Sequence, residues 1–222
     1  MTKPWTDGPR ELIQHAVDHL ELGGDFDRRI AMISIDNAVE LMIKVSLGLP
    51  ERARGAKGPS RKELETAAES FPEMLNLLET YSGARLVGVG LDDVEWFHRL
   101  RNQLYHSGNG ITVERAKVET YLEIAKALFL ALFDAPIALS KQLSFETKTG
   151  QFLGLWNTFE RELHDALYKR TSKLFDPAAE TAYQAVRHFR NELVHGVATP
   201  DPRLIDEHIH TLEKLLAKSR KK

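Results

Sequence analysis

Cysteine is missing from this chain of 222 residues, which excludes disulfide bonds, thiolate zinc sites and cysteine nucleophiles. A long apolar run is missing too. The longest, AKALFLALFDAPIAL at 125–139, is broken by Asp134 and Pro136 and is too short to span a bilayer. The first residues, MTKPWTDGPRE, lack the apolar core of an export signal. We therefore expect a cytoplasmic protein without a membrane partner.

The chain also lacks an excess of one charge sign, since 30 Lys and Arg residues stand against 32 Asp and Glu residues. Its global charge therefore does not indicate a nucleic-acid partner, and any such function must depend on local charge. One basic stretch, ERARGAKGPSRK at 51–62, contains a single acidic residue. Such a loop is usually only solvated, but its charge could also guide RNA through phosphate contacts. Its basic residues are Arg52, Arg54, Lys57, Arg61 and Lys62.

Apolar spacing typical of helices recurs along the whole chain, whereas the period-two alternation of strands is nearly absent. The sequence therefore predicts an all-α protein. Several local signals mark helix starts: two capping boxes and two Asp-Pro pairs, in which a capping residue precedes proline at the first helical position. The capping boxes are Ser60 with Glu63 and Asp92 with Glu95, and the pairs are Asp176-Pro177 and Asp201-Pro202. The expected helices are 9–22, 26–47, 61–81 with a kink or break at Phe71-Pro72, one opened by Asp92, one from Thr112 to before Pro136, 150–173, one from Pro177 to Gly196, and one from Pro202 to about 218.

The pattern Arg-Asn-x-Leu-x-His occurs twice, as RNQLYH at 101–106 and as RNELVH at 190–195. Each copy lies near the end of an expected helix and is followed by a glycine. Each motif helix also stands between a long apolar helix and a leucine-rich one. This weak internal repeat predicts two helical domains, residues 1–137 and a shorter one at 138–222.

Helical geometry places the asparagine and the histidine of each copy on one face, because they are four residues apart. The arginine precedes the asparagine by one residue, and its long side chain can lean onto that face. The negative end of the helix dipole favours a protonated histidine in the last turn. The six motif residues are Arg101, Asn102, His106, Arg190, Asn191 and His195.

These residue types suit the cleavage of RNA without a metal. A histidine with a near-neutral pKa transfers protons, an arginine binds a phosphate through two donors, and an asparagine orients either group. If two copies faced one cleft, one histidine could take the proton of the 2′-hydroxyl while the other protonated the leaving 5′-oxygen. The arginines would stabilise the charged intermediate. DNA lacks the 2′-hydroxyl and should not be cut in this way.

RNQLYH and RNELVH resemble the Arg-x(4–6)-His signature of the HEPN superfamily, and IDNAVELMIKVSL at 35–47 is similar to an early helix of such domains. The resemblance implies two HEPN-like bundles in tandem, packed as a pseudo-dimer, that form a metal-independent endoribonuclease without a cofactor. It further implies a role as a toxin or an antiphage-defence effector, with RNA as the substrate and an antitoxin or defence-complex protein as a partner. It assigns the catalytic roles to Arg101, Asn102, His106, Arg190, Asn191 and His195.

Two alternatives stay open at this point. The bundles could be a catalytically inactive interaction subunit of a defence or toxin–antitoxin complex, or the site could form between two chains of a homodimer. The spacing of Asp36, Glu40 and Lys44 favours an exposed ion-pair stripe on a helix, and the alternative is that Asp36 or Glu40 orients a motif arginine. The pairs His15–His19 and His208–His210 lack a third ligand nearby, so we predict no metal site.

Overall fold

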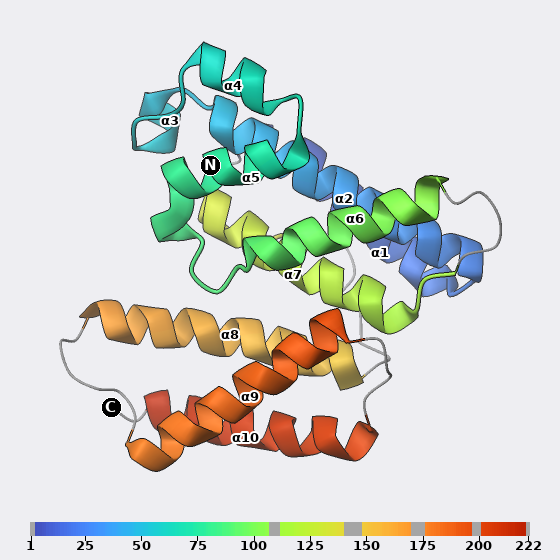
Figure 1. Cartoon of the computed structure of the whole chain (residues 1–222), viewed down its shortest axis with the longest axis vertical. Coiled ribbons are helices and arrows are strands. Elements are labelled where there is room, and N and C mark those ends of the chain that lie inside the picture. The colour runs from blue at the N-terminus through green and yellow to red at the C-terminus, as the bar shows by residue number, and fades with distance from the viewer. Residues whose placement is uncertain (1–2, 107–111, 140–147, 170–175, 197–200, 221–222) are drawn as a thin grey trace. The chain divides into compact units, whose positions relative to one another are not determined.

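The computed structural model describes residues 3–106, 112–139, 148–169, 176–196 and 201–220. The chain divides into two compact units, residues 1–143 and residues 144–222. All regular elements among the described residues are helices, which confirms the all-α prediction (Figure 1). None of the described helices is long and apolar enough to cross a membrane.

Unit 1 contains seven α-helices within its described residues. They are α1 (Asp7–Leu22), α2 (Asp25–Gly48), α3 (Glu51–Arg54), α4 (Arg61–Ala67), α5 (Phe71–Ser82), α6 (Leu91–His106) and α7 (Arg115–Phe133). Unit 2 contains α8 (Lys148–Lys169), α9 (Pro177–His195) and α10 (Pro202–Arg220). Short 3₁₀ turns lie at Pro4–Thr6 and Gly83–Arg85.

Several helix boundaries lie where the local sequence signals place them. The side chain of Ser60 accepts a hydrogen bond from the backbone of Glu63, and that of Glu63 accepts one in return, so the predicted capping box is present. The expected break before Pro72 separates α4 from α5. Asp176 caps α9 by accepting a hydrogen bond from the backbone of Ala179 at 2.9 Å.

Three boundaries differ from the expectation. Helix α6 begins at Leu91, so Asp92 lies inside the first turn and is not the capping residue. Helix α7 begins at Arg115, three residues after Thr112. The basic stretch after Pro50 is not a loop throughout, because its first four residues form α3.

Helix α2 is the central element of unit 1. It packs against α1, α5, α6 and α7, and buried apolar residues such as Ile35, Val39 and Met42 occur on most of its sides. A helix that is apolar nearly all round is stable only when other helices cover it. Helices α2 and α6 run in opposite directions, so the end of α6 lies at the same end of the bundle as the start of α2 (Figure 1).

The described part of unit 2 is a bundle of three helices, in which α10 packs against both α8 and α9. Its core contains aromatic side chains: Trp156 stacks on Tyr183, and Phe152 meets Phe189 edge to face. An ion pair between Asp176 and Lys218 joins the start of α9 to the end of α10. This packing fixes the orientation of α9, which carries the second motif.

Candidate active site

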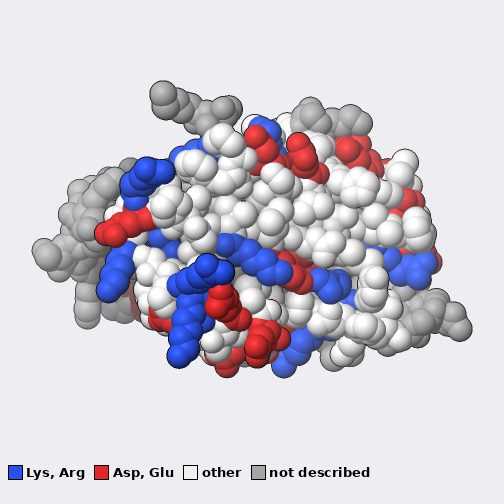
Figure 2. All heavy atoms as spheres, turned by 90° about the horizontal axis from the view of Figure 1, so that it is seen from above, with Lys and Arg blue, Asp and Glu red and all other residues white. Residues whose placement is uncertain are grey.

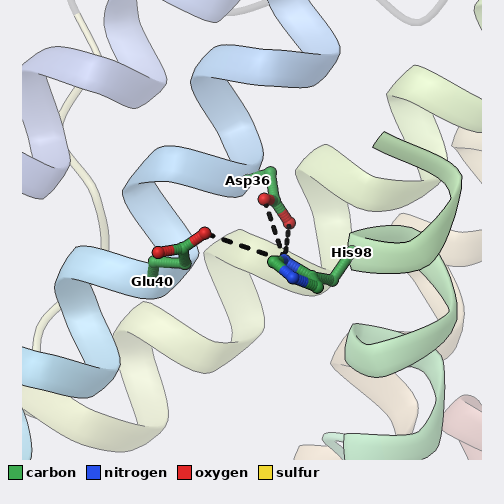
Figure 3. Close-up of side chains that lie close together, drawn as sticks. All are labelled: Asp36, Glu40 and His98. Carbon is green, nitrogen blue, oxygen red and sulfur yellow. Dashed lines mark hydrogen bonds and ion pairs between the residues drawn. The ribbon is translucent and has the colours of Figure 1, made fainter. Parts of the chain in front are cut away.

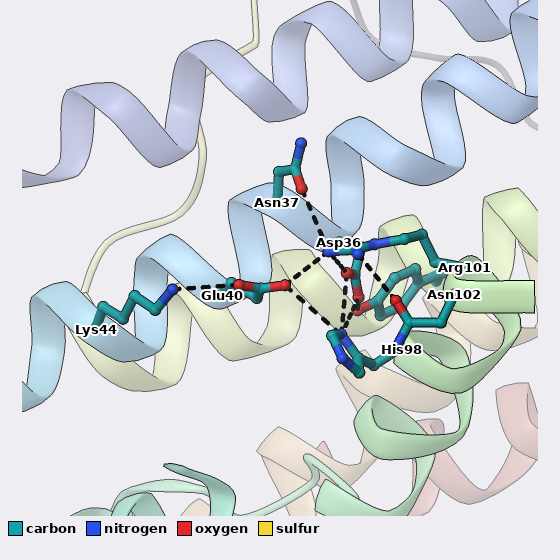
Figure 4. A network of polar contacts seen from close by, with 8 residues as sticks. Asp36, Asn37, Glu40, Lys44, His98, Arg101 and Asn102 are labelled. Atoms are coloured by element: carbon teal, nitrogen blue, oxygen red, sulfur yellow. Dashed lines mark hydrogen bonds and ion pairs between the residues drawn. The ribbon is translucent and has the colours of Figure 1, made fainter. Parts of the chain in front are cut away.

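The first motif arginine is held by two acidic residues of the central helix. The Nη2 atom of Arg101 lies 2.5 Å from Oδ2 of Asp36 and 2.6 Å from Oε1 of Glu40 (Figure 4). Asp36 is completely buried, and the Arg101 side chain is only 17% exposed. The two carboxylates are one helical turn apart on α2, so a single guanidinium reaches both. The favoured reading of Asp36 as part of an exposed stripe is therefore wrong, because α6 and α7 cover that side of α2.

Two further groups complete the hydrogen bonding of Asp36. The hydroxyl of Tyr121, on α7, donates to Oδ1 of Asp36 at 2.7 Å. Nδ1 of His98, one turn before Arg101 on α6, lies 3.1 Å from Oδ2 of the same carboxylate. Burial, followed by the negative charge of Asp36, raises the pKa of Tyr121 well above its ordinary value. Tyr121 is therefore a neutral hydrogen-bond donor at any ordinary pH.

His98 is held between two elements. Its ring stacks on Phe71, the first residue of α5, with a centroid distance of 3.9 Å and an interplanar angle of 17°. On its other side it meets Asp36 and, at 3.7 Å, Oε1 of Glu40. The break between α4 and α5 thus has a consequence for the site, since it brings Phe71 onto the imidazole. His98 belongs to the site but is absent from the set of residues that the motif spacing predicts.

Asp36, Glu40 and His98 also form a group with the ligand types of a metal site. Their ligand atoms all lie within 4.8 Å of one another (Figure 3). However, the guanidinium of Arg101 already provides a positive charge within 2.6 Å of both carboxylates. Lys44 adds a second, with Nζ 3.3 Å from Oε2 of Glu40. The two negative charges are thus balanced by two side-chain cations, and a divalent ion would have to displace Arg101.

Asn102 and His106 extend the first motif toward solvent. Nη1 of Arg101 donates to Oδ1 of Asn102 at 2.9 Å, which leaves the amide nitrogen of Asn102 as a donor. His106 is the last residue of α6 and is exposed. Its ring meets that of Tyr105 edge to face, with 5.5 Å between centroids. Gly108, which follows the motif in the sequence, lies outside the described residues.

The second motif repeats this arrangement within unit 2. Arg190 is buried and its Nη1 donates to Oδ1 of Asn191 at 3.3 Å. His195 is exposed and is the last residue of α9, which ends at Gly196. In both motifs the arginine is thus covered, the adjacent asparagine accepts its hydrogen bond, and the histidine ends the helix in solvent.

An acidic residue of the preceding long helix accompanies the arginine in both units. In unit 2 this residue is Glu160 of α8, which accepts a hydrogen bond from the hydroxyl of Tyr183 at 3.0 Å. Burial raises the pKa of Glu160, while that hydrogen bond and the positive charges of Arg187 and Arg190 act in the opposite direction. Each motif arginine therefore has a partly or fully buried carboxylate near it. Asp36 in unit 1 and Glu160 in unit 2 each accept a hydrogen bond from a tyrosine hydroxyl. The motif spacing gives no sign of Glu160 or of either tyrosine.

The basic residues of 51–62 do not act as one group. Arg52, Lys57, Arg61 and Lys62 are exposed, as expected for residues that meet solvent or RNA. Arg54 is only 8% exposed, and its Nη2 donates to Oγ of Ser82 at 2.8 Å. The prediction of a phosphate-binding role is thus wrong for Arg54, because its guanidinium is used to join the end of α2 to the end of α5.

Two of the exposed basic residues, Arg61 and Lys62, lie beside acidic ones. Lys62 lines a shallow hollow between α4 and α5 that also contains Glu63 and Glu73. Arg61 pairs with Glu65, with 2.8 Å between Nε and Oε1. Over the described residues of the face seen in Figure 2, Lys and Arg side chains alternate with Asp and Glu. Among the side chains coloured on this face, there is no broad patch of one charge sign that would attract a polyanion.

No known family model, curated protein or solved structure matches this chain. The evidence for a function therefore lies in the two repeated hexapeptides and the residues around them.

Proposed function

We propose that this protein is a metal-independent endoribonuclease in which Arg101, Asn102 and His106 act together with Arg190, Asn191 and His195. The observation that carries the proposal is the shared arrangement of the two motifs. Each has a covered arginine beside a carboxylate, a hydrogen-bonded asparagine and an exposed histidine at the helix end. The resemblance of both hexapeptides to the HEPN signature agrees with this assignment. The tandem HEPN-like organisation as a pseudo-dimer is part of the same proposal.

The proposed reaction is a transesterification. The 2′-oxygen of a ribose attacks the adjacent phosphorus as one motif histidine accepts its proton. The bond from phosphorus to the 5′-oxygen breaks, and the other histidine, in its protonated form, gives a proton to that oxygen. The products are a 2′,3′-cyclic phosphate and a 5′-hydroxyl. The remaining donors of the two arginines stabilise the negative charge on the phosphorane.

Asp36 and Glu40 are positioning residues in this proposal. They hold Nη2 of Arg101, while Nη1 donates to Oδ1 of Asn102 (Figure 4). The carboxylates would otherwise be candidate metal ligands, and their pairing with Arg101 and Lys44 supports chemistry that does not require a divalent ion. A toxin or antiphage-defence role, with a protein partner that restrains the nuclease, follows only from the family resemblance.

The decisive experiment is the incubation of the pure protein with mixed RNA in excess EDTA. We expect the wild type to cleave and the His106→Ala/His195→Ala double variant to be inactive. A matched control is the His188→Ala/His210→Ala variant, because both of these histidines are exposed and lie outside the motifs. Cleavage by the motif double variant at the wild-type rate would refute the proposal. End-group analysis should find the cyclic phosphate on the 5′ fragment.

A second experiment tests whether the two motifs form one site. Arg101→Ala and Arg190→Ala should each abolish cleavage, because residues that act as a unit lose activity together. If the site forms between two chains, a mixture of the two single variants regains activity through heterodimers. A site formed within one chain gains nothing from mixing. Full activity of either variant alone would refute the composite site.

One observation favours a second candidate function. Nη2 of Arg101 is paired with two carboxylates, which is also what a purely structural arginine requires. On this reading the protein is a catalytically inactive interaction subunit, and the motif residues stabilise the bundles. Arg101→Ala would then lower the stability of unit 1 and the binding of a partner, while RNA stays intact with every variant.

A further inference from the structure

Two aromatic side chains of unit 1 are largely exposed, and one of them belongs to the first motif. Tyr105 is 66% exposed and Phe26 is 61% exposed, although burial normally stabilises rings of this size. The Tyr105 ring meets the His106 ring at 5.5 Å. The Phe26 ring lies 5.7 Å below the guanidinium carbon of Arg29. A flat ligand group on Tyr105 would therefore adjoin the proposed catalytic histidine.

The second motif differs at the position that precedes its histidine. The residue that precedes its histidine is Val194, which is 1% exposed and belongs to the core of unit 2. The two motifs thus share arginine, asparagine, leucine and histidine, but only the first carries an exposed ring beside its histidine. A packing role does not account for Tyr105, because two thirds of its surface faces solvent.

A cation lies at the same end of the α2–α6 pair. Arg29 is near the start of α2, and Tyr105 is near the end of α6, which runs in the opposite direction (Figure 1). The two acidic residues closest to Arg29 in the sequence are engaged elsewhere: Asp25 pairs with Arg28, and Asp27 lies 2.9 Å from Nδ1 of His19. The buried Nε of Arg29 has no hydrogen-bond partner among the described residues. No ion pair of the Arg29 guanidinium occurs within the described part of the chain, so its positive charge is left for an anionic ligand.

We propose that Tyr105 stacks on one unpaired RNA base beside the scissile phosphate, while Arg29 contacts the neighbouring backbone phosphate. This inference rests on the proposed ribonuclease function. It predicts an asymmetric substrate site, in which the base on one side of the cleaved bond is held by stacking and the base on the other side is not. Stacking of a base on an aromatic side chain tolerates every base but requires that the base is unpaired.

The test measures binding separately from cleavage. A 12-nucleotide RNA in which every 2′-hydroxyl is replaced by fluorine lacks the nucleophile, and 2-aminopurine within it reports stacking by fluorescence quenching. The proteins are the full-length wild type, Tyr105→Ala, Tyr105→Phe and Arg29→Ala. The control is Arg99→Ala, since Arg99 is an exposed cation on the same helix as Tyr105. Circular dichroism verifies that each variant is folded.

We expect Tyr105→Ala to weaken single-strand binding by about tenfold or more and to abolish the quenching, because one stacked base contributes about five- to 150-fold in affinity. Tyr105→Phe keeps the ring and should bind within about twofold of the wild type. Arg29→Ala should weaken binding and reduce its salt dependence by about one ion. Arg99→Ala should match the wild type.

The inference is wrong if Tyr105→Ala binds the single strand with wild-type affinity. It is also wrong if Tyr105→Phe and Tyr105→Ala lose the same amount of affinity. Failure of the wild type to bind the single strand overturns it as well. If binding depends on the Tyr105 ring but natural RNA stays intact, the proposed ribonuclease function is wrong while the binding site is present. If RNA is cleaved and Tyr105→Ala equals the wild type in rate and affinity, the nuclease stands and the stacking site does not.

Discussion

The buried carboxylate of Asp36 gives the sharpest prediction about stability. It accepts from Tyr121, pairs with Arg101 and contacts His98, and it has no exposure to solvent. The Asp36→Ala substitution would leave these buried groups without their common partner. Breaking a buried ion pair by removing one member destabilises a protein by about 3–5 kcal/mol. Because Arg101 keeps Glu40, we expect the lower end of this range, about 3 kcal/mol.

Glu40→Ala is the matched comparison. Glu40 contacts the same guanidinium, but its side chain is 23% exposed, so water can replace part of what is lost. Its removal should destabilise unit 1 by about 1 kcal/mol. The double variant Asp36→Ala/Arg101→Met removes both buried charges. Its loss in the free energy of unfolding should therefore be smaller than the summed losses of Asp36→Ala and Arg101→Met, by at least about 1 kcal/mol.

Hydrogen exchange in increasing urea measures these differences where they arise. Peptides from α2 and α6 should lose protection at lower urea in Asp36→Ala than in the wild type. Peptides from α8 and α9 belong to unit 2 and serve as the internal reference. Equal effects of Asp36→Ala and Glu40→Ala, or strict additivity in the double variant, would refute the assignment of Asp36 as the buried anchor of Arg101.

Three further predictions concern other buried or half-buried polar groups. Arg54→Met should lower the free energy of unfolding by about 2 kcal/mol, because the hydroxyl of Ser82 and the end of α2 lose a buried donor. The control Arg52→Ala should change it by less than about 0.5 kcal/mol, because Arg52 is exposed. Urea denaturation measures both values. Burial raises the pKa of Glu160 above the ordinary value of 4.5, so the folded protein binds this proton more tightly than the unfolded chain does. The resulting stabilisation is complete below pH 4.5 and is lost as the pH rises through the pKa of the folded state. Glu160→Gln should therefore be more stable than the wild type at pH 7, and the difference should vanish below pH 4.5 in thermal unfolding scans. Burial and, after it, the negative charge of Glu160 raise the pKa of Tyr183 to about 12. Ultraviolet difference titration should show that this pKa falls toward 10 in the Glu160→Gln variant. An unchanged pKa of Tyr183 would contradict the contact between the two side chains.

Local signals in the sequence are sufficient for much of the fold. Ser60 with Glu63, and Asp176 with Pro177, satisfy free backbone groups at a helix start, so they act over a few residues and can be read from one segment. The break before Pro72 is equally local. Helix α6 begins at Leu91, before Asp92, because the backbone N–H of Val94 donates a hydrogen bond to the carbonyl of Gly90. The capping pattern of Asp92 with Glu95 does not reveal this bond.

The surroundings of Arg101 are harder to predict, because Asp36, His98 and Tyr121 come from three helices. Asp36 lies on a helix that is apolar on most sides, and the sequence does not show which neighbour covers its few charged positions. His98 lies three residues before Arg101, and this spacing on one helix face is the signal that would have found it. Tyr121 joins the site only through the packing of α7 on α2, for which no local pattern exists.

The ion pairs of Arg101 with Asp36 and Glu40 also have an entropic consequence. A free arginine side chain has about 2 kcal/mol of rotamer entropy, which it loses when a ligand orders it. Contacts at Nη1 and Nη2 already hold the Arg101 guanidinium in one orientation, so this freedom is lost during folding. An exposed cation such as Arg52 still has that freedom to lose. An anion that meets Arg101 thus binds to a donor group that is already ordered.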